Sequence, residues 1–133
     1  MLKPEAIKMR IIGEIIRRIE SKGLRVVALK LIKASKKHVE KLYEMHKDKP
    51  FYEKLVNWVA SGPIVVMVVE GNSAINVMRE LAGATNPAEA APGTIRKDYG
   101  LNITQNVIHA ADGPENALRE IRIFFRRNDI FEY

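Results

Sequence analysis

The chain has 133 residues, 47% of them hydrophobic and 29% charged, which suits one folded domain over 1–133 rather than a disordered polymer. It lacks cysteine, which excludes disulfides and thiolate chemistry, and no apolar run is long enough to cross a membrane, so a cytoplasmic location is expected. The net charge of +6 favours phosphate-bearing partners, although plain solubility explains such a surplus equally well and nucleic acids would suit it too.

The first third of the sequence predicts a helix, a strand and a second helix. Isoleucines recur at helical spacing between charged residues, which predicts a helix over roughly 8–22 with Gly23 as its stop. Alternating apolar residues then predict a strand over 24–33. Ser35 is a suitable N-cap for a helix that continues to His46.

The middle of the sequence predicts a short helix, a buried strand and another helix. Pro50 interrupts the chain before apolar residues at helical spacing around 55–59. The run 63–70 is almost entirely apolar and predicts a strand that is buried on both faces. Ser73 can cap the next helix, whose apolar residues lie within 75–81.

The last third combines a long loop with a short strand and a helix. The stretch 83–106 is expected to be irregular, and loops of this length in a small domain usually have a function. A short strand is expected at 106–108, and a helix opens at 112–114 with a proline in its first turn. The apolar face of this helix is expected to comprise Leu118, Ile121, Phe124 and Phe125.

The strands are few and one connection joins helix to helix. This pattern favours an α+β sandwich, in which helices cover a mainly antiparallel sheet, over a doubly wound parallel sheet.

No Walker loop and no glycine-rich kinase loop is present, so a phosphate group would have to be bound in another way. The long loop and the helix before it offer Arg79, Thr85, Asn86, Thr94 and Arg96. Arginine presents a planar fork of donors that matches phosphate oxygens. The alternative is that these arginines are only solvated surface residues.

Among the histidines, His109 has the most suggestive position, because it follows an apolar segment and precedes a helix start. Imidazole is nucleophilic near neutral pH and can accept a phosphoryl group. The alternative is a structural histidine that only makes hydrogen bonds.

The segment 106–112, Asn-Val-Ile-His-Ala-Ala-Asp, resembles the active-site signature of nucleoside diphosphate kinases, Asn-x-x-His-x-Ser-Asp. Three further blocks resemble this family in the same order along the chain. They are Lys3-Pro4-Glu5-Ala6, Ser61-Gly62-Pro63, and the loop Gly83–Pro87 with Ala91–Arg96.

The resemblance implies a ferredoxin-like βαββαβ fold and a ping-pong transfer of the γ-phosphate between nucleotides, with His109 as the nucleophile. Glu120 matches the glutamate that hydrogen-bonds the far nitrogen of the histidine ring. The matched substrate-binding positions are Arg79, Thr85, Arg96, Tyr43 and His46 for phosphate, Lys3 and Asn106 for the sugar, and Phe51, Leu55 and Ile103 for the base.

The resemblance also implies that Mg²⁺ is held mainly by the nucleotide phosphates, without a protein metal site, and that the chain forms hexamers or tetramers. Nucleoside di- and triphosphates are thus the expected partners.

Two other hypotheses remain at this point. One is a nucleic-acid-binding domain, although no RNP-type aromatic motif is present. The other is a catalytically weak or inactive relative with a regulatory or structural role.

Three features depart from the family pattern. Ala111 stands where a serine is usual, so one hydrogen bond near the phosphate is expected to be lost, and Glu5 replaces an aspartate. Few residues precede Lys3, where the family has a central strand, so the natural chain is expected to extend further upstream or to pair differently.

Overall fold

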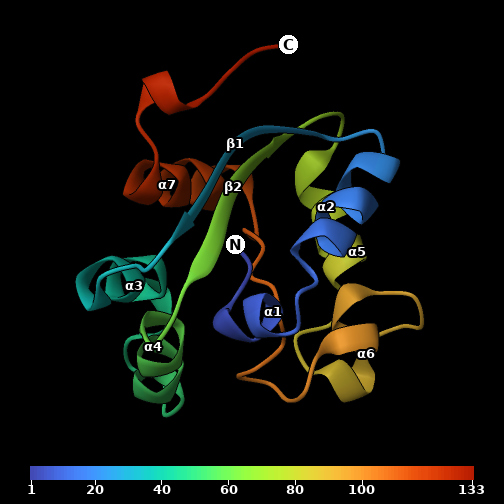
Figure 1. Cartoon of the computed structure of the whole chain (residues 1–133). Coiled ribbons are helices and arrows are strands. Elements are labelled where there is room, and N and C mark those ends of the chain that lie inside the picture. Colours follow the sequence, from blue (N-terminus) through green and yellow to red (C-terminus); the bar gives the residue numbers. More distant parts are fainter.

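The computed structural model describes residues 1–133 and consists of two long strands with helices on both sides (Figure 1). The strands are β1 (Arg25–Ile32) and β2 (Ile64–Glu70). The helices are α1 (Pro4–Lys8), α2 (Ile12–Ser21), α3 (Lys36–Leu42), α4 (Tyr52–Ala60), α5 (Ala74–Ala82), α6 (Ile95–Tyr99) and α7 (Pro114–Phe124), with short 3-10 turns at Glu44–His46, Pro87–Glu89 and Arg127–Asp129. None of these helices has the length and apolar character that a bilayer crossing requires.

The sheet is antiparallel and continues beyond its two long strands. β1 pairs with β2 from Arg25↔Glu70 to Ile32↔Ile64, with an irregularity between Val26 and Ala28. On the other edge of β2, Leu2 forms bridges to both Val65 and Ile108. The spatial order is therefore β1, β2, Leu2, Ile108, which confirms the predicted α+β arrangement with an antiparallel sheet covered by helices.

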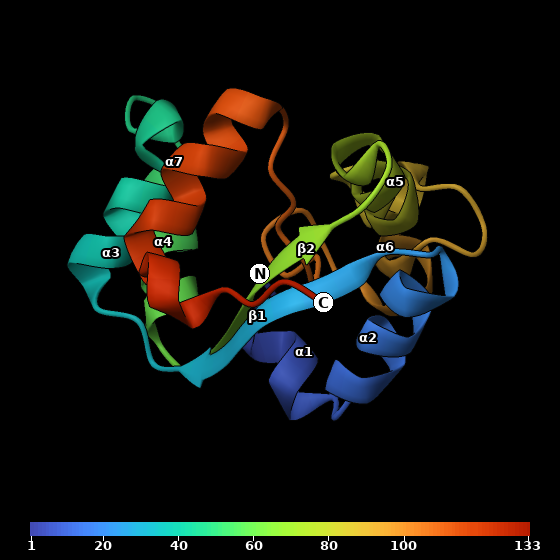
Figure 2. The ribbon, with the colours of Figure 1, turned by 90° about the horizontal axis from the view of Figure 1, so that it is seen from above.

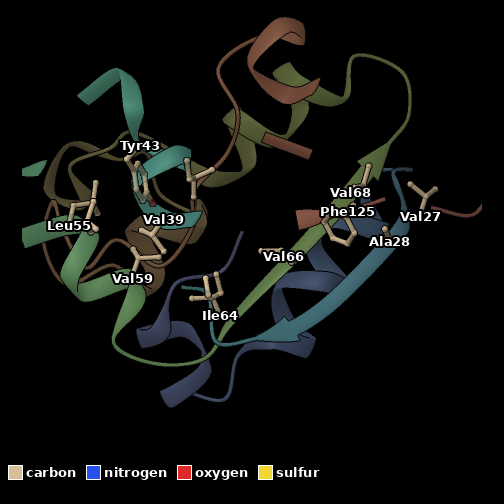
Figure 3. Packing of buried hydrophobic residues seen from close by; sticks show 13 residues of the cluster. Val27, Ala28, Val39, Tyr43, Leu55, Val59, Ile64, Val66, Val68 and Phe125 are labelled. Atoms are coloured by element: carbon tan, nitrogen blue, oxygen red, sulfur yellow. The ribbon is translucent and has the colours of Figure 1, made fainter. Parts of the chain in front are cut away.

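Helices α3, α4 and α7 cover one face of the sheet, and α1, α2, α5 and α6 cover the other (Figure 2). Side chains of β2 alternate between the two faces, so that Ile64 and Val66 join one apolar cluster while Val65 joins the second. Figure 3 shows the first cluster, where Val39 and Val59 of the helices approach β2. The prediction that 63–70 is buried on both faces is confirmed, because most of β2 is inaccessible to solvent.

The predicted helix over 8–22 is wrong in its first part. Lys8 belongs to α1, and the chain breaks at Arg10, which has a left-handed φ of +59°, before α2 begins at Ile12. No glycine or proline marks this break, so the sequence carried no local signal for it. Gly23 does follow the end of α2 with a φ of +79°, as predicted for a stop residue.

Several boundaries in the other predicted elements also differ. The helix that Ser35 caps ends at Leu42, and His46 lies in a separate 3-10 turn. The segment 83–106 is not wholly irregular, since it contains a 3-10 turn and α6, which Thr94 caps by accepting from the Lys97 N–H. Ile108 makes only an isolated bridge instead of the predicted strand.

Two further details of the predicted helices are wrong. Ser73 precedes α5 as expected, but its side chain makes no capping hydrogen bond. Leu118 is 56% exposed and does not belong to the buried face of α7, whereas Ile121 and Phe124 pack against the core. Phe125 is buried but follows the last residue of the helix.

The N-terminal residues occupy the centre of the sheet. The Leu2 N–H donates to the Val65 carbonyl at 2.7 Å and the Val65 N–H donates back to Leu2 at 3.1 Å. On the opposite side, the Lys3 N–H donates to the Val107 carbonyl and the His109 N–H to the Met1 carbonyl, both at 2.8 Å. Three residues thus supply central ladder bonds, and an apolar cavity of about 140 Å³ lies next to them between β2, α5 and α7.

Leu2 is fully buried at the junction of these segments. We expect Leu2→Ala to lower the free energy of unfolding by about 2–5 kcal/mol, because truncation leaves a cavity that the sheet cannot fill. Leu118→Ala is the matched control and should change this free energy by less than about 0.5 kcal/mol. Denaturant titration measures both; equal losses in the two variants would contradict the central position of Leu2.

Candidate active site

One open cleft of about 550 Å³ is lined by all the catalytic and substrate-binding residues that the family resemblance implied. Asn86 and Thr94, which the long loop also offered for phosphate, do not line it, because their side chains cap short helices by accepting from the Ala88 and Lys97 N–H groups. Its walls come from the segment after α3, the start of α4, the end of α5, the long loop and the segment before α7. The predicted residues that line it are Lys3, Tyr43, His46, Phe51, Leu55, Arg79, Thr85, Arg96, Ile103, Asn106, His109 and Glu120.

His109 lies at the base of the cleft with its ring held in one orientation. Its backbone N–H is fixed by the Met1 carbonyl, and its Nε2 is hydrogen-bonded to Glu120 Oε1 on α7. The ring packs edge-on against Tyr43, with 5.3 Å between the ring centroids. Nδ1, on the other side of the ring, has no hydrogen-bond partner, so it is the nitrogen that remains free to react.

Burial lowers the pKa of His109 below its ordinary value, because the apolar surroundings disfavour the charged ring. The hydrogen bond and negative charge of Glu120 act in the opposite direction without reversing the shift, and the positive charge of Lys3 adds to the lowering. The ring is therefore neutral at pH 7, which is the form of imidazole that can act as a nucleophile.

Two arginines approach the cleft from different elements. The Arg96 guanidinium donates to the Gly83 carbonyl and to the Ile108 carbonyl, each at 2.7 Å, so it ties the long loop to the segment that carries His109. Arg79 lies exposed in the last turn of α5. Thr85 is exposed on the loop between the two arginines.

Lys3 and Asn106 form a buried polar pair beside His109. Lys3 Nζ donates to Asn106 Oδ1 at 2.7 Å and to the Thr104 carbonyl at 3.0 Å. Asn106 Nδ2 donates to the Thr85 carbonyl at 2.9 Å, which connects the pair to the long loop. Burial lowers the pKa of Lys3 to about 8, so its ammonium group is still mostly charged at neutral pH.

Three polar atoms in this cleft are buried and have no partner: the Tyr43 hydroxyl, His46 Nδ1 and Arg96 Nε. Burial raises the pKa of Tyr43 and lowers the pKa of His46, so neither side chain is charged at pH 7. Unpaired buried donors cost free energy unless a ligand or water pairs with them. A ligand rich in acceptor oxygens, such as a phosphate chain, would satisfy them.

The outer part of the cleft is apolar. Phe51 is 41% exposed and Ile103 is 59% exposed, and both are available for contact with a planar group. Leu55 also lines the cleft but is only 7% exposed, because most of its side chain belongs to the core. Leu55 therefore offers less accessible surface for the predicted contact with a base than Phe51 and Ile103 do.

The structure adds cleft residues that the sequence did not single out, among them Lys49, Thr104 and Asp112. Lys49 lies in a run of charged residues that reads as solvated surface, and Thr104 contributes through its backbone carbonyl, which side-chain patterns do not reveal. Asp112 is part of the active-site segment 106–112, which was the one available signal for it.

The chain is similar to known proteins over nearly its whole length. The family model described as nucleoside diphosphate kinase matches residues 1–130. The nucleoside diphosphate kinase of Methanocaldococcus jannaschii is 53% identical over 131 residues, which are 98% of this chain and 94% of that protein. The one of Archaeoglobus fulgidus is 50% identical over 133 residues, covering 100% of this chain and 88% of that protein.

Solved structures of such kinases have the same fold. The Aquifex aeolicus nucleoside diphosphate kinase aligns with a TM-score of 0.95 at 36% identity and covers 98% of this chain and 94% of that one. The Halobacterium salinarum enzyme, solved in complex with CDP, aligns with a TM-score of 0.95 at 39% identity and covers 99% and 88%.

The environment of His109 gives a prediction for its titration. We expect an NMR titration of the His109 ring to show a midpoint below the usual 6.5, because burial disfavours protonation. In Glu120→Gln the midpoint should fall further, since the carboxylate is the group that stabilises the protonated ring. A midpoint at or above 6.5, or one that Glu120→Gln leaves unchanged, would contradict this account.

Proposed function

This chain belongs to the nucleoside diphosphate kinase family, and we propose that it transfers the γ-phosphate of a nucleoside triphosphate to a nucleoside diphosphate through a phosphohistidine at His109. The observation that carries the proposal is the state of the His109 ring. Nε2 is fixed by Glu120, the ring is neutral, and Nδ1 is free in a cleft that gathers cationic and donor groups.

The reaction has two balanced halves. In the first, the lone pair of Nδ1 forms a bond to the γ-phosphorus, the bond from that phosphorus to the bridging oxygen breaks, and the nucleoside diphosphate leaves with the electron pair. In the second, a terminal oxygen of another nucleoside diphosphate forms a bond to the phosphorus of the phosphohistidine, the bond between that phosphorus and Nδ1 breaks, and Nδ1 regains its electron pair. Glu120 supports both halves, because it accepts a hydrogen bond from the Nε2–H group and stabilises the positive ring that forms when Nδ1 is phosphorylated.

Charged and donor groups can hold the phosphate chain in line with Nδ1. Arg96 and Arg79 would bind phosphate oxygens, and the unpaired Tyr43 hydroxyl and His46 Nδ1 supply further partners. The Thr85 hydroxyl would donate from the loop. These groups are arranged before the nucleotide arrives, which favours electrostatic stabilisation of the transferred group.

The remaining residues suit the nucleoside part. Lys3 and Asn106 present polar atoms for sugar hydroxyls, and Phe51, Ile103 and the accessible part of Leu55 offer apolar contact to a base. Contact of this kind accepts any base, since every base has a π-face. The Halobacterium salinarum relative was solved in complex with CDP, which supports a nucleotide as the ligand of this chain.

Mg²⁺ fits the proposal as an ion that travels with the nucleotide. The structure forms no group of three or more histidine, aspartate or glutamate side chains that could hold a metal ion, so the phosphate oxygens would be its main ligands. When bound, the ion offsets negative charge on the phosphate chain.

An inactive or weakly active relative is the alternative, and Ala111 in place of serine is the observation that favours it.

Assembly into hexamers or tetramers and a cytoplasmic location also stay predictions. Light scattering on the purified protein measures the first of these.

The intermediate gives the direct test. With γ-labelled ATP and Mg²⁺ but no acceptor, we expect a labelled protein whose label is lost in acid, survives base and moves to added GDP. His109→Ala should remain unlabelled, and His38→Ala, in an exposed residue of α3 outside the cleft, is the matched control that should still be labelled. A folded wild-type protein that takes up no label would favour the inactive relative.

The serine that is usual at position 111 gives a second test. Ala111 and Glu120 both line the apolar cavity, and the family resemblance implies that a serine hydroxyl at position 111 forms a hydrogen bond near the phosphate and the glutamate. One added hydrogen bond is worth roughly 0.5–1.5 kcal/mol, so Ala111→Ser should raise kcat by about two- to tenfold. Steady-state kinetics measure it, and an equal or lower kcat would count against the expected role of this hydroxyl.

A further inference from the structure

The peptide just before His109 makes a turn that is unusual for its residue type. The Ile108 N–H donates to the Asn106 carbonyl at 2.9 Å, and Val107 between them has a φ of +77°. This combination is a γ-turn with positive φ, a rare and strained conformation, and a β-branched residue adopts it with particular difficulty. Val107 is also fully buried, so its N–H needs a partner inside the protein.

Glu5 supplies that partner. It lies in α1, is only 3% exposed, and accepts the Val107 N–H with Oε2 at 3.0 Å. Its other oxygen, Oε1, accepts from Trp58 Nε1 on α4 at 2.7 Å. Glu5 itself does not line the cleft, so it would act on the reaction only through the residues that it holds.

The turn separates two groups that must keep a fixed relation. Asn106 precedes it and accepts from Lys3 Nζ, while His109 follows it and carries the reactive nitrogen. The φ angle of Val107 sets the direction of the chain on both sides. If Val107 relaxed to the negative φ that valine prefers, Asn106 and His109 would move relative to each other.

We propose that Glu5 is a positioning residue for phosphate transfer, whose carboxylate holds the Val107 γ-turn and thereby sets the relative placement of Asn106 and His109. The proposal rests on the function proposed above for these two residues. A buried carboxylate that only stabilises the fold is the competing explanation, and the experiment has to separate the two.

Three variants form a graded series. Glu5→Met keeps the bulk of the side chain but removes both strong acceptors. Glu5→Gln leaves one neutral acceptor oxygen for two donors, so this oxygen can accept the Val107 N–H only when the amide NH2 faces Trp58 Nε1; exchange of the Val107 amide reports whether it does. Trp58→Phe is the matched control, because it removes the hydrogen bond to Oε1 and leaves the one to Val107 in place.

The kinetics of phosphate transfer would be measured at a temperature where circular dichroism shows each variant folded, together with hydrogen exchange of the Val107 amide. We expect kcat to fall by about ten- to a hundredfold in Glu5→Met, which is the scale of a misplaced reacting group. Glu5→Gln should keep most of the wild-type kcat. Trp58→Phe should keep kcat close to that of the wild type even if its melting temperature falls. Faster exchange of the Val107 amide should accompany the loss of rate.

Equal losses of kcat in Glu5→Met and Trp58→Phe would overturn the proposal and leave Glu5 a purely structural residue. If Glu5→Met does not fold, Glu5→Gln still decides, because the exchange rate of the Val107 amide and kcat should change together: both stay near the wild type if the Gln oxygen accepts the Val107 N–H, and exchange rises while kcat falls if it does not. Faster exchange with an unchanged kcat, or a lower kcat with unchanged exchange, would overturn the proposal. A wild-type enzyme that transfers phosphate without labelling His109 would contradict the proposed phosphohistidine. That result is distinct from the outcomes above, because they compare kcat and amide exchange between variants and do not measure labelling.

Discussion

The backbone pairing of Met1–Lys3 is the interaction on which the rest of the site depends. These residues bond to Val65 on one side and to Val107 and His109 on the other, so they fix the segment 106–109 to the sheet although this segment forms no strand of its own. The same pairing places the Lys3 side chain beside Asn106. A shift of one residue in this register would turn Lys3 toward the opposite face and separate it from the cleft.

The cleft gathers two largely buried cations and three polar atoms that lack partners. Lys3 and Arg96 are largely buried, and burial lowers the pKa of each, which means that the fold holds these cations against a desolvation cost. The unpaired atoms of Tyr43, His46 and Arg96 add to that cost. Such an arrangement is unfavourable for the protein without a ligand and becomes favourable when an anionic ligand binds. The free energy of unfolding of the ligand-free protein is therefore lower than it could be, and the binding groups are already in position.

The sequence allowed us to predict those helices, strands and site residues that have a local pattern or a counterpart in the family resemblance. β2 and α7 were identified from an apolar run and from a proline at a helix start, and the catalytic and substrate-binding residues that the family resemblance implied all line one cleft. The break at Arg10, the helix α6 and the outward position of Leu118 were missed or wrong. Tertiary packing decides the break and the position of Leu118, whereas α6 is a helix of only five residues that Thr94 caps inside a loop rich in glycine and proline. The contact of Glu5 with Val107 joins residues that are 102 positions apart, and no pattern in a single sequence reveals such a pair.

Two carboxylates hold the reactive segment from opposite sides, and they do so in different ways. Glu120 on α7 holds the ring of His109, whereas Glu5 on α1 holds the backbone two residues earlier. A strained φ such as that of Val107 costs on the order of 1–3 kcal/mol and persists only where its surroundings enforce it. The outer cleft, by contrast, offers Phe51 and Ile103 as exposed apolar surfaces with few constraints. In the function proposed above, tight control of His109 together with loose contact at the base would allow one site to accept many nucleotides while the same group is transferred from each.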